Sequence, residues 1–193
     1  MLKTHPSKQN KKHNSKQSKS VHTELAEVKR SKIKMSKQFT KIYQEHYDKV
    51  YRLCLGYVNG DQALAKDLSQ DVFIKVWEHL DKFQQKSSIG TWIYRITVNV
   101  CLLFIRKNKK KKKLKFTEIK DEIQEENDDQ NRMQQMYSCI YKLKETERII
   151  ILLILEGLPQ KEIAEVTGHS HQNIRVMVHR IKEKLTKCVS NGI

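Results

Sequence analysis

Apolar residues recur every three or four positions from residue 39 onward, which is the spacing of one face of an α-helix. The first such face comprises Phe39, Tyr43, Tyr47, Val50, Cys54 and Val58. Asn59-Gly60 then predicts a turn, and Asp61 is suited to cap a second helix. The buried side of that helix is predicted at Leu64, Leu68, Val72, Val76 and Leu80, with Phe73 and Trp77 beside it.

A third helix is predicted to begin at Thr91, after a polar loop at 83–90 that is rich in small residues. Its apolar positions are Trp92, Ile93, Ile96, Val100 and Leu103. The helix leads into Arg106-Lys107-Asn108 and then five consecutive lysines at 109–113. Aromatic residues beside cations suit single-stranded or melting DNA, because bases stack on aromatic rings while cations follow the phosphates. Trp92 by itself is more often a core residue.

An acidic and polar stretch at 118–129 separates these patterns from a second helical block. The block begins with a helix face formed by Met133, Met136, Tyr137, Ile140 and Leu143. A buried helix is predicted next, at 147–156. The fold class predicted is therefore all-α, with two small helical domains at 37–108 and 132–190 joined by a flexible charged linker at 109–131.

The end of the second block, 158–185, predicts two short helices separated by a glycine turn. Pro159 suits the first helical position, and Gly168 can adopt the positive φ that ends the first helix at Thr167. Ser170 is a good cap for the second helix. The predicted buried stripe comprises Ile163, Ala164 and Val166 in the first helix and Ile174, Met177, Val178, Ile181 and Leu185 in the second.

The outer face of the second helix is polar and basic, with His171, Gln172, Arg175, Val176, His179 and Lys182. A helix, a glycine turn and a second helix with such a face are typical of a DNA-binding helix-turn-helix, whose second helix lies in the major groove. Arginine can read guanine there, and glutamine or asparagine can read adenine. A helical hairpin with a solvated basic face would show the same pattern.

The formal net charge of +16 on 193 residues indicates a polyanionic partner, either nucleic acid or an anionic membrane surface. No apolar stretch is expected to be long enough to cross a bilayer, which takes ~20 residues. The basic N-terminus lacks the apolar core of a secretory signal, so a cytoplasmic location is expected. Residues 1–36 form a basic tail whose composition predicts disorder. Its lysines would add salt-sensitive, non-specific affinity for DNA or RNA, or have no dedicated role.

The residue types give no indication of catalysis, a metal or another cofactor. Cys54, Cys101, Cys139 and Cys188 lack C-x-x-C spacing, which argues against zinc and predicts reduced thiols. His169 and His171 would not hold a metal by themselves. Phosphate-binding glycine loops and a recognisable catalytic triad are missing from the sequence.

Three segments, in order, resemble the bacterial sigma factors of the extracytoplasmic-function group, which keep only the second and fourth conserved regions. The first is 65–73, AKDLSQDVF, and the second is 91–96, TWIYRI, followed by Asn99 and Arg106. The third comprises 156–158, 162–165 and Arg180. The resemblance covers nearly all of 39–188 and implies a non-enzymatic transcription initiation factor.

The resemblance also implies residue roles and partners. Contacts to the coiled coil of the largest subunit of core RNA polymerase are expected at Asp67, Gln70, Asp71 and Ile74. The flap of the polymerase is a further expected partner. Contacts to the minus-ten element, including a pocket in the loop for a flipped base, are expected at Phe83, Lys86, Ser87, Ser88, Trp92, Arg95, Asn99 and Arg106. Contacts to the minus-thirty-five element, from the helix-turn-helix at 160–185, are expected at Ser170, His171, Gln172, Asn173, Arg175, Val176, His179 and Arg180. An anti-sigma protein is a further implied partner, and no small-molecule substrate is implied.

Two other functions fit parts of the chain. A stand-alone helix-turn-helix regulator would bind duplex DNA without polymerase, although it has no obvious use for the first domain. An RNA-binding protein could use the basic tail and the lysines at 109–113, but no RNA-binding module is recognisable.

Overall fold

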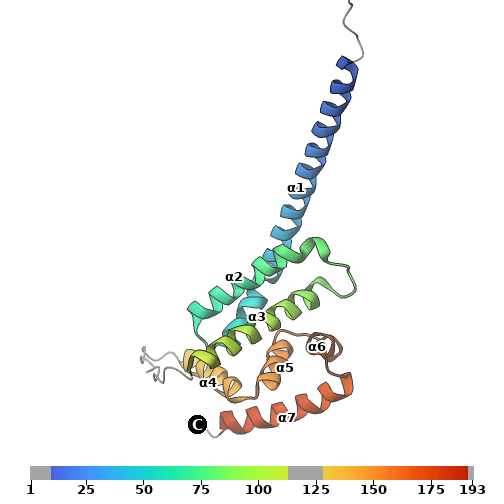
Figure 1. The fold of residues 1–193 in the computed structure, drawn as a ribbon. Helices are drawn as coiled ribbons and strands as arrows, with labels where there is room; N and C mark the ends of the chain where they lie inside the picture. Colours follow the sequence, from blue (N-terminus) through green and yellow to red (C-terminus); the bar gives the residue numbers. More distant parts are fainter. Residues whose placement is uncertain (1–9, 113–127, 191–193) are drawn as a thin grey trace, which may run out of the picture. The chain divides into compact units, whose positions relative to one another are not determined.

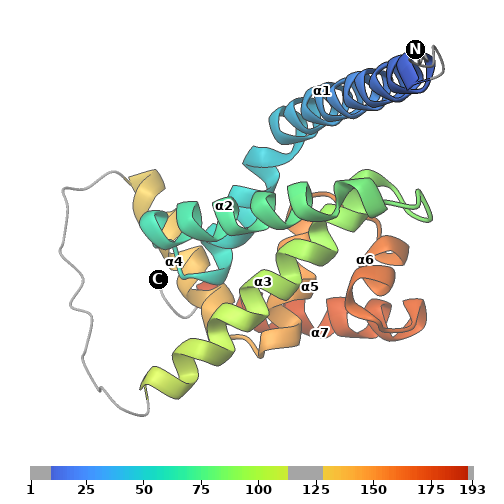
Figure 2. The ribbon, with the colours of Figure 1, turned by 45° about the horizontal axis from the view of Figure 1, so that its top comes forward.

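The computed structural model describes the backbone of residues 10–112 and 128–190, with side chains at 29–107 and 132–190. Within these ranges all regular structure is helical, which confirms the all-α prediction. The chain forms two compact units, unit 1 at Met1–Ile42 and unit 2 at Tyr43–Ile193. Helix α1 (Asn10–Tyr57) belongs to both, and the other helices lie in unit 2 (Figures 1 and 2).

Helix α1 begins far earlier than the composition of the tail predicted. Disorder was expected over 1–36, whereas residues 10–36 are helical in the structure and residues 1–9 lie outside the described range. The difference has a local cause. Lysine, glutamine, glutamate and alanine favour helix, and extending an existing helix costs far less than nucleating a new one.

The first bundle of unit 2 consists of α1 from Tyr43, α2 (Gln62–His79), the short 3₁₀ helix η1 (Leu80–Lys82) and α3 (Ile89–Lys112). Figures 1 and 2 both show α2 and α3 side by side. Asp61 caps α2 as predicted, because its carboxylate accepts the Leu64 N–H at 2.9 Å. Most of the predicted apolar stripe of α2 is buried, but Leu64 and Trp77 are 36% and 39% exposed.

Helix α3 differs from its prediction at both ends. It begins at Ile89 instead of Thr91, because Ser88 Oγ accepts the Thr91 N–H at 3.1 Å and acts as the cap. It also continues through the lysine run as far as Lys112. By length and composition alone, Ile89–Lys107 could cross a membrane, with mean hydropathy 1.3, so the expectation that no apolar stretch approaches that length is wrong. Part of this apolarity is explained by core packing, since Ile93, Tyr94, Val98 and Cys101 are buried.

The second bundle consists of α4 (Asp128–Lys142), α5 (Glu145–Leu155), α6 (Gln160–Thr167) and α7 (His171–Ser190). Its core is aliphatic and draws on all four helices. Pro159 is the N-cap of α6 and not its first helical residue. Most of the predicted linker, at 113–127, lies outside the described residues.

The prediction of four reduced thiols is wrong for one pair. Cys139 in α4 and Cys188 in α7 form a disulfide across 49 positions of the sequence. Residue spacing gave no sign of it, because the two cysteines meet only when α7 packs against α4. Cys54 and Cys101 are free thiols, as predicted.

Candidate polymerase and nucleic-acid interfaces

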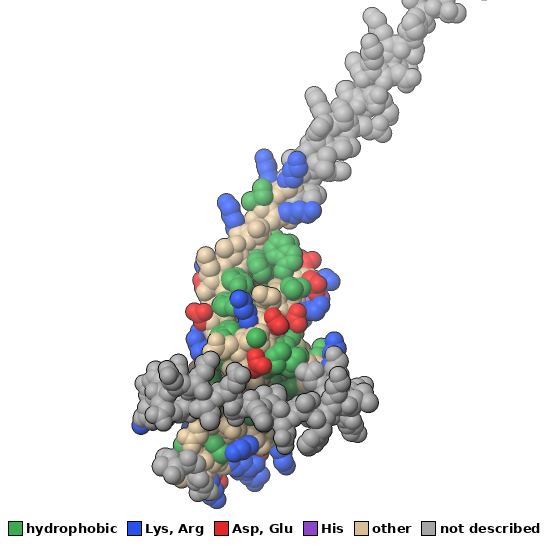
Figure 3. Space-filling view, turned by 90° about the vertical axis from the view of Figure 1, so that its left-hand side faces the viewer, with side chains coloured by type: hydrophobic (Ala, Val, Ile, Leu, Met, Phe, Trp, Pro, Cys, Tyr) green, Lys and Arg blue, Asp and Glu red, His purple; other side chains and the backbone are tan. Residues whose placement is uncertain are grey.

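One side of α2 presents the four residues expected to dock on polymerase. Asp67, Gln70, Asp71 and Ile74 are all exposed, and Ile74 is 52% exposed despite its apolar side chain. The spacing i, i+3, i+4, i+7 places them on one helix face. Figure 3 shows a surface of the same character, with exposed hydrophobic side chains beside acidic ones. An apolar residue exposed among carboxylates is suited to contact a complementary protein surface.

This exposed face of α2 keeps its orientation because the opposite side of the helix is buried. Leu68, Val72, Phe73 and Val76 are at most 3% exposed. Tyr43 of α1 packs edge-on against Phe73, with ring centroids 4.7 Å apart. These contacts fix the rotation of α2 about its axis, and with it the direction of the acidic residues.

The loop and the start of α3 bring together part of the expected minus-ten site. The rings of Phe83 and Trp92 lie 5.1 Å apart, and Ser88 and Thr91 exchange a hydroxyl hydrogen bond at 2.7 Å. Lys86 is exposed beside them, and Ser87 is half-buried. A tethered aromatic pair with a nearby cation can stack a base and pair with a phosphate.

Along α3, Trp92 and three further expected contacts share one stripe. Trp92, Arg95, Asn99 and Arg106 are spaced i, i+3, i+7 and i+14, so they recur on one helix face. Arg95, Asn99 and Arg106 are exposed, and Trp92 is half-buried. The stripe is cationic and polar, while the buried residues of α3 face the core.

The turn between α6 and α7 has the predicted geometry. Gly168 adopts φ 72°, ψ 21°, and its N–H donates to the Ala164 carbonyl at 2.9 Å. Ser170 Oγ accepts the Asn173 N–H at 3.2 Å and caps α7. Only glycine takes the left-handed conformation at no steric cost, so Gly168 sets the direction in which α7 leaves the turn.

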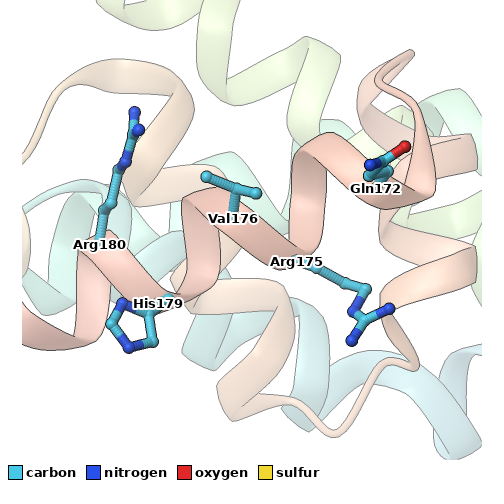
Figure 4. Close-up of a pocket in the computed structure, with 5 residues that line it drawn as sticks. All are labelled: Gln172, Arg175, Val176, His179 and Arg180. Carbon is cyan, nitrogen blue, oxygen red and sulfur yellow. The ribbon is translucent and has the colours of Figure 1, made fainter.

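Helix α7 buries Ile174, Val178 and Ile181 and exposes the residues expected to read DNA. Five of these line a shallow open hollow: Gln172, Arg175, Val176, His179 and Arg180. Figure 4 shows Gln172, Val176 and Arg180 in one row along the helix, with Arg175 and His179 pointing the other way. His171 and Asn173 are also exposed. The face offers donors and acceptors over about two helical turns, the length that a major groove admits.

The structure also reveals contacts between the two bundles that the sequence did not indicate. Arg52 of α1 donates two hydrogen bonds, at 2.9 and 2.7 Å, to the carboxylate of Glu156 at the end of α5. This bidentate pairing raises the pKa of Arg52. The Glu156 side chain is only 5% exposed, so removal of Arg52 would leave a buried carboxylate without this partner.

A second contact joins α3 to α6. The Thr91 hydroxyl donates to the Glu162 carboxylate, and Arg95 Nη2 donates to the Glu165 carbonyl at 3.0 Å. Arg95 therefore combines an expected DNA role with a contact to the helix-turn-helix. Partners some 70 positions apart leave no periodic signal, so only the tertiary structure could reveal them.

The described residues contain no group of three or more histidine, cysteine, aspartate or glutamate side chains placed to hold a metal ion. The arrangement instead offers two helix faces of opposite charge and a loop with an aromatic pair. These features suit binding to protein and to nucleic acid.

Comparison with known proteins agrees with this arrangement. Residues 42–111 match the family model of sigma-70 region 2, and residues 133–185 match that of sigma-70 region 4. RNA polymerase sigma factor SigZ of Bacillus subtilis is 34% identical over 128 residues, which cover 65% of this chain and 73% of that protein. The extracytoplasmic-function sigma factor SigW of the same organism is 29% identical over 167 residues, covering 77% and 87%.

Among solved structures, the sigma factor RpoE of Bartonella quintana, determined in complex with the anti-sigma factor NepR, is similar to this chain with a TM-score of 0.67. The alignment covers 80% of this chain and 98% of that one at 21% identity, which shows a shared fold. The two family models match the two bundles in the expected order. The chain therefore belongs to the extracytoplasmic-function sigma factors, and it is a transcription initiation factor that binds core RNA polymerase and recognises promoter DNA.

Proposed function

We propose that three surfaces of unit 2 divide the work of promoter opening. The acidic face of α2, at Asp67, Gln70, Asp71 and Ile74, docks on the coiled coil of the polymerase. The loop at 83–88 and the stripe along α3 capture the separated minus-ten strand. The outer face of α7 reads the minus-thirty-five element as duplex. Residues 37–108 and 132–190 act as the two functional domains.

The observation that carries this proposal is the opposite charge of two exposed helix faces on one chain. Asp67 and Asp71 are exposed on α2, and Arg175 and Arg180 are exposed on α7. DNA would repel the first face and attract the second. A stand-alone DNA-binding regulator explains only the face on α7.

Simultaneous use of both promoter elements requires the two bundles to separate. Element centres about 25 base pairs apart lie about 85 Å apart along a duplex that rises 34–36 Å per turn. A compact unit of about 150 residues has a radius of gyration of only about 15 Å. The contacts of Arg52 with Glu156 and of Arg95 with Glu165 therefore open when the polymerase-bound factor engages a promoter.

Three further properties follow from the same proposal. The factor has no catalysis of its own, as is general for sigma factors, and it supplies only binding energy and position. It works in the cytoplasm, where core polymerase and the chromosome are found. An anti-sigma protein holds it inactive, which is supported by the anti-sigma complex of the similar RpoE.

Reconstituted transcription tests the proposal. Purified core polymerase, this protein and genomic fragments of its organism are combined, and unpaired thymines are detected with permanganate. Discrete start sites are expected, with reactive thymines just upstream of them, and both should require the protein and the core enzyme. The bundle distance is measured in the same complexes by energy transfer between dyes on α2 and α7, and it should increase when promoter DNA is added.

Two results would contradict the proposal. Specific DNA binding without strand opening, with core polymerase present, would favour the stand-alone regulator. Preference for RNA over a promoter duplex would favour the RNA-binding alternative. A control without core polymerase separates intrinsic DNA binding from polymerase-dependent opening.

A further inference from the structure

The four cysteines form two pairs, one in each bundle of unit 2, and the pairs differ in accessibility. Cys54 and Cys101 are both 0% exposed, with sulfur atoms 4.0 Å apart. They share a hydrogen bond, which lowers the pKa of Cys54 and raises that of Cys101. Cys139 is 3% exposed, whereas Cys188 is half-buried. A reagent in solution can therefore reach only the second pair, through Cys188.

The position of Cys188 makes its bond to Cys139 suitable for reversible formation. Cys188 lies two residues before the end of α7 at Ser190, and its Cα is 5.9 Å from that of Cys139. This separation is within the usual range for a disulfide. Small displacements of a terminal helical turn suffice to bring the sulfurs together or to separate them.

Among the described residues, the last turns of α7 around Cys188 bury few side chains. The buried stripe of α7 ends at Ile181. Beyond it, Lys184 pairs with Glu147 of α5 at 2.5 Å, and the side chain of Lys184 is 50% exposed. The disulfide adds a covalent link between the last turns of α7 and α4.

We propose that Cys139 and Cys188 are a reversible thiol–disulfide site, oxidised by low-molecular-weight disulfides, which locks the C-terminal end of the DNA-reading helix onto α4. Disulfides in reducing compartments are usually transient or redox-sensing. The reversibility therefore rests on the proposed cytoplasmic location, while formation of the bond does not.

The chemistry is two successive exchanges. The Cys188 thiolate attacks one sulfur of the small disulfide, forms a mixed disulfide and releases one small thiolate. The Cys139 thiolate then attacks the Cys188 sulfur, forms the internal bond and releases the second thiolate. The protein loses two electrons and two protons, and the small disulfide gains them as two thiols.

The test is thiol counting on the full-length protein in buffers of defined ratios of reduced and oxidised glutathione. Each sample is then acid-quenched, denatured and alkylated, so that the buried Cys54 and Cys101 are counted as well. Two of the four thiols should be lost to alkylation as the ratio becomes oxidising, and peptide mapping should locate the bond between 139 and 188. Dithiothreitol should restore all four under native conditions. The melting temperature of the oxidised form should exceed that of the reduced form by about 5–10 °C.

Cys188→Ser should abolish the thiol loss and the melting difference, whereas the control Cys54→Ala should retain both. Circular dichroism establishes that each variant is folded, and Cys139→Ala serves if Cys188→Ser is not. Retention of four reactive thiols under oxidising conditions would overturn the proposal, as would an internal bond that resists dithiothreitol in the folded protein. None of these measurements uses DNA or polymerase, so the outcome is independent of the promoter-opening proposal.

Discussion

Helices α2 and α7 are built alike and present opposite surfaces. Each buries one apolar stripe, and each is capped by the side chain of the residue that precedes it, Asp61 for α2 and Ser170 for α7. The exposed face of α2 carries Asp67, Asp71 and the apolar Ile74. The exposed face of α7 carries two arginines, glutamine and histidine.

The comparison shows that burial sets the position of a helix and that the exposed residues set its partner. Carboxylates around an apolar side chain are suited to a basic protein surface, and DNA repels them. Guanidinium and amide groups are suited to base edges and phosphates. Substitutions made in the buried stripe alone or on the exposed face alone therefore test whether the first sets position and the second sets the partner.

The largest effect is expected from the buried stripe of α7. Ile174 is 0% exposed, and Ile174→Ala should reduce the free energy of unfolding by about 2–5 kcal/mol, because it leaves a cavity in the core. Thermal or chemical denaturation measures the loss. Val176→Ala, on the exposed face of the same helix, should leave stability nearly unchanged. Similar losses for both variants would contradict the assignment of the two faces.

Charge reversal on α2 is expected to affect polymerase binding and not DNA binding. Asp71→Lys replaces an attractive contact by a repulsive one and should weaken binding to core polymerase by about 2–4 kcal/mol. A quantitative pull-down with core polymerase measures the change, and circular dichroism establishes that the helix is intact. Asp48→Lys makes the same change at an exposed site on α1 and should bind like the parent. Equal binding by Asp71→Lys would remove the docking role from this face.

Removal of a side chain from the outer face of α7 should show the opposite result, affecting DNA binding and not polymerase binding. Arg175→Ala should weaken binding to the preferred upstream element by about 1–3 kcal/mol and relax preference at one base pair. Binding to a set of single-base variants of the element measures both effects. Lys187→Ala, an exposed cation in the last turn, should leave base preference unchanged. A uniform loss over all sequences would make Arg175 a phosphate contact.

The smallest effect is expected from the ion pair between Lys184 of α7 and Glu147 of α5. Burial raises the pKa of Glu147, but hydrogen bonds from Lys184 and from the Lys144 N–H outweigh it and hold the pKa below its usual value. The contribution of this ion pair to the free energy of unfolding is therefore present above the ordinary glutamate pKa of about 4.3, and it is lost as the pH falls below that value.

Lys184→Met should cost about 0.2–1 kcal/mol of unfolding free energy at neutral pH, since the lysine is half exposed. The difference from the parent should shrink as the pH falls below about 4. Chemical denaturation over a pH series measures it. Lys182→Met, an exposed neighbour on α7, should show no such dependence, and a pH-independent loss at Lys184 would indicate packing and not charge.

Residue pattern alone predicted much of this molecule. The 3.6-residue period located the α-helices of unit 2, although α3 continues to Lys112, beyond its predicted end. Local chemistry located Asp61, Gly168 and Ser170. The resemblance in three segments identified the family. All these signals are local, since helix phase, capping and turn conformation depend on residues a few positions apart.

Tertiary structure decided the features that join distant positions. The disulfide between Cys139 and Cys188, the pairing of Arg52 with Glu156 and the contact of Arg95 with Glu165 span 49 to 104 positions. The disorder predicted from composition was also wrong at residues 10–36, because helix propagation outweighs the lack of apolar residues there. A periodic pattern states which side of a helix is buried, but not which helix covers it, because many partners offer an equivalent apolar surface. Three-dimensional packing alone makes that choice.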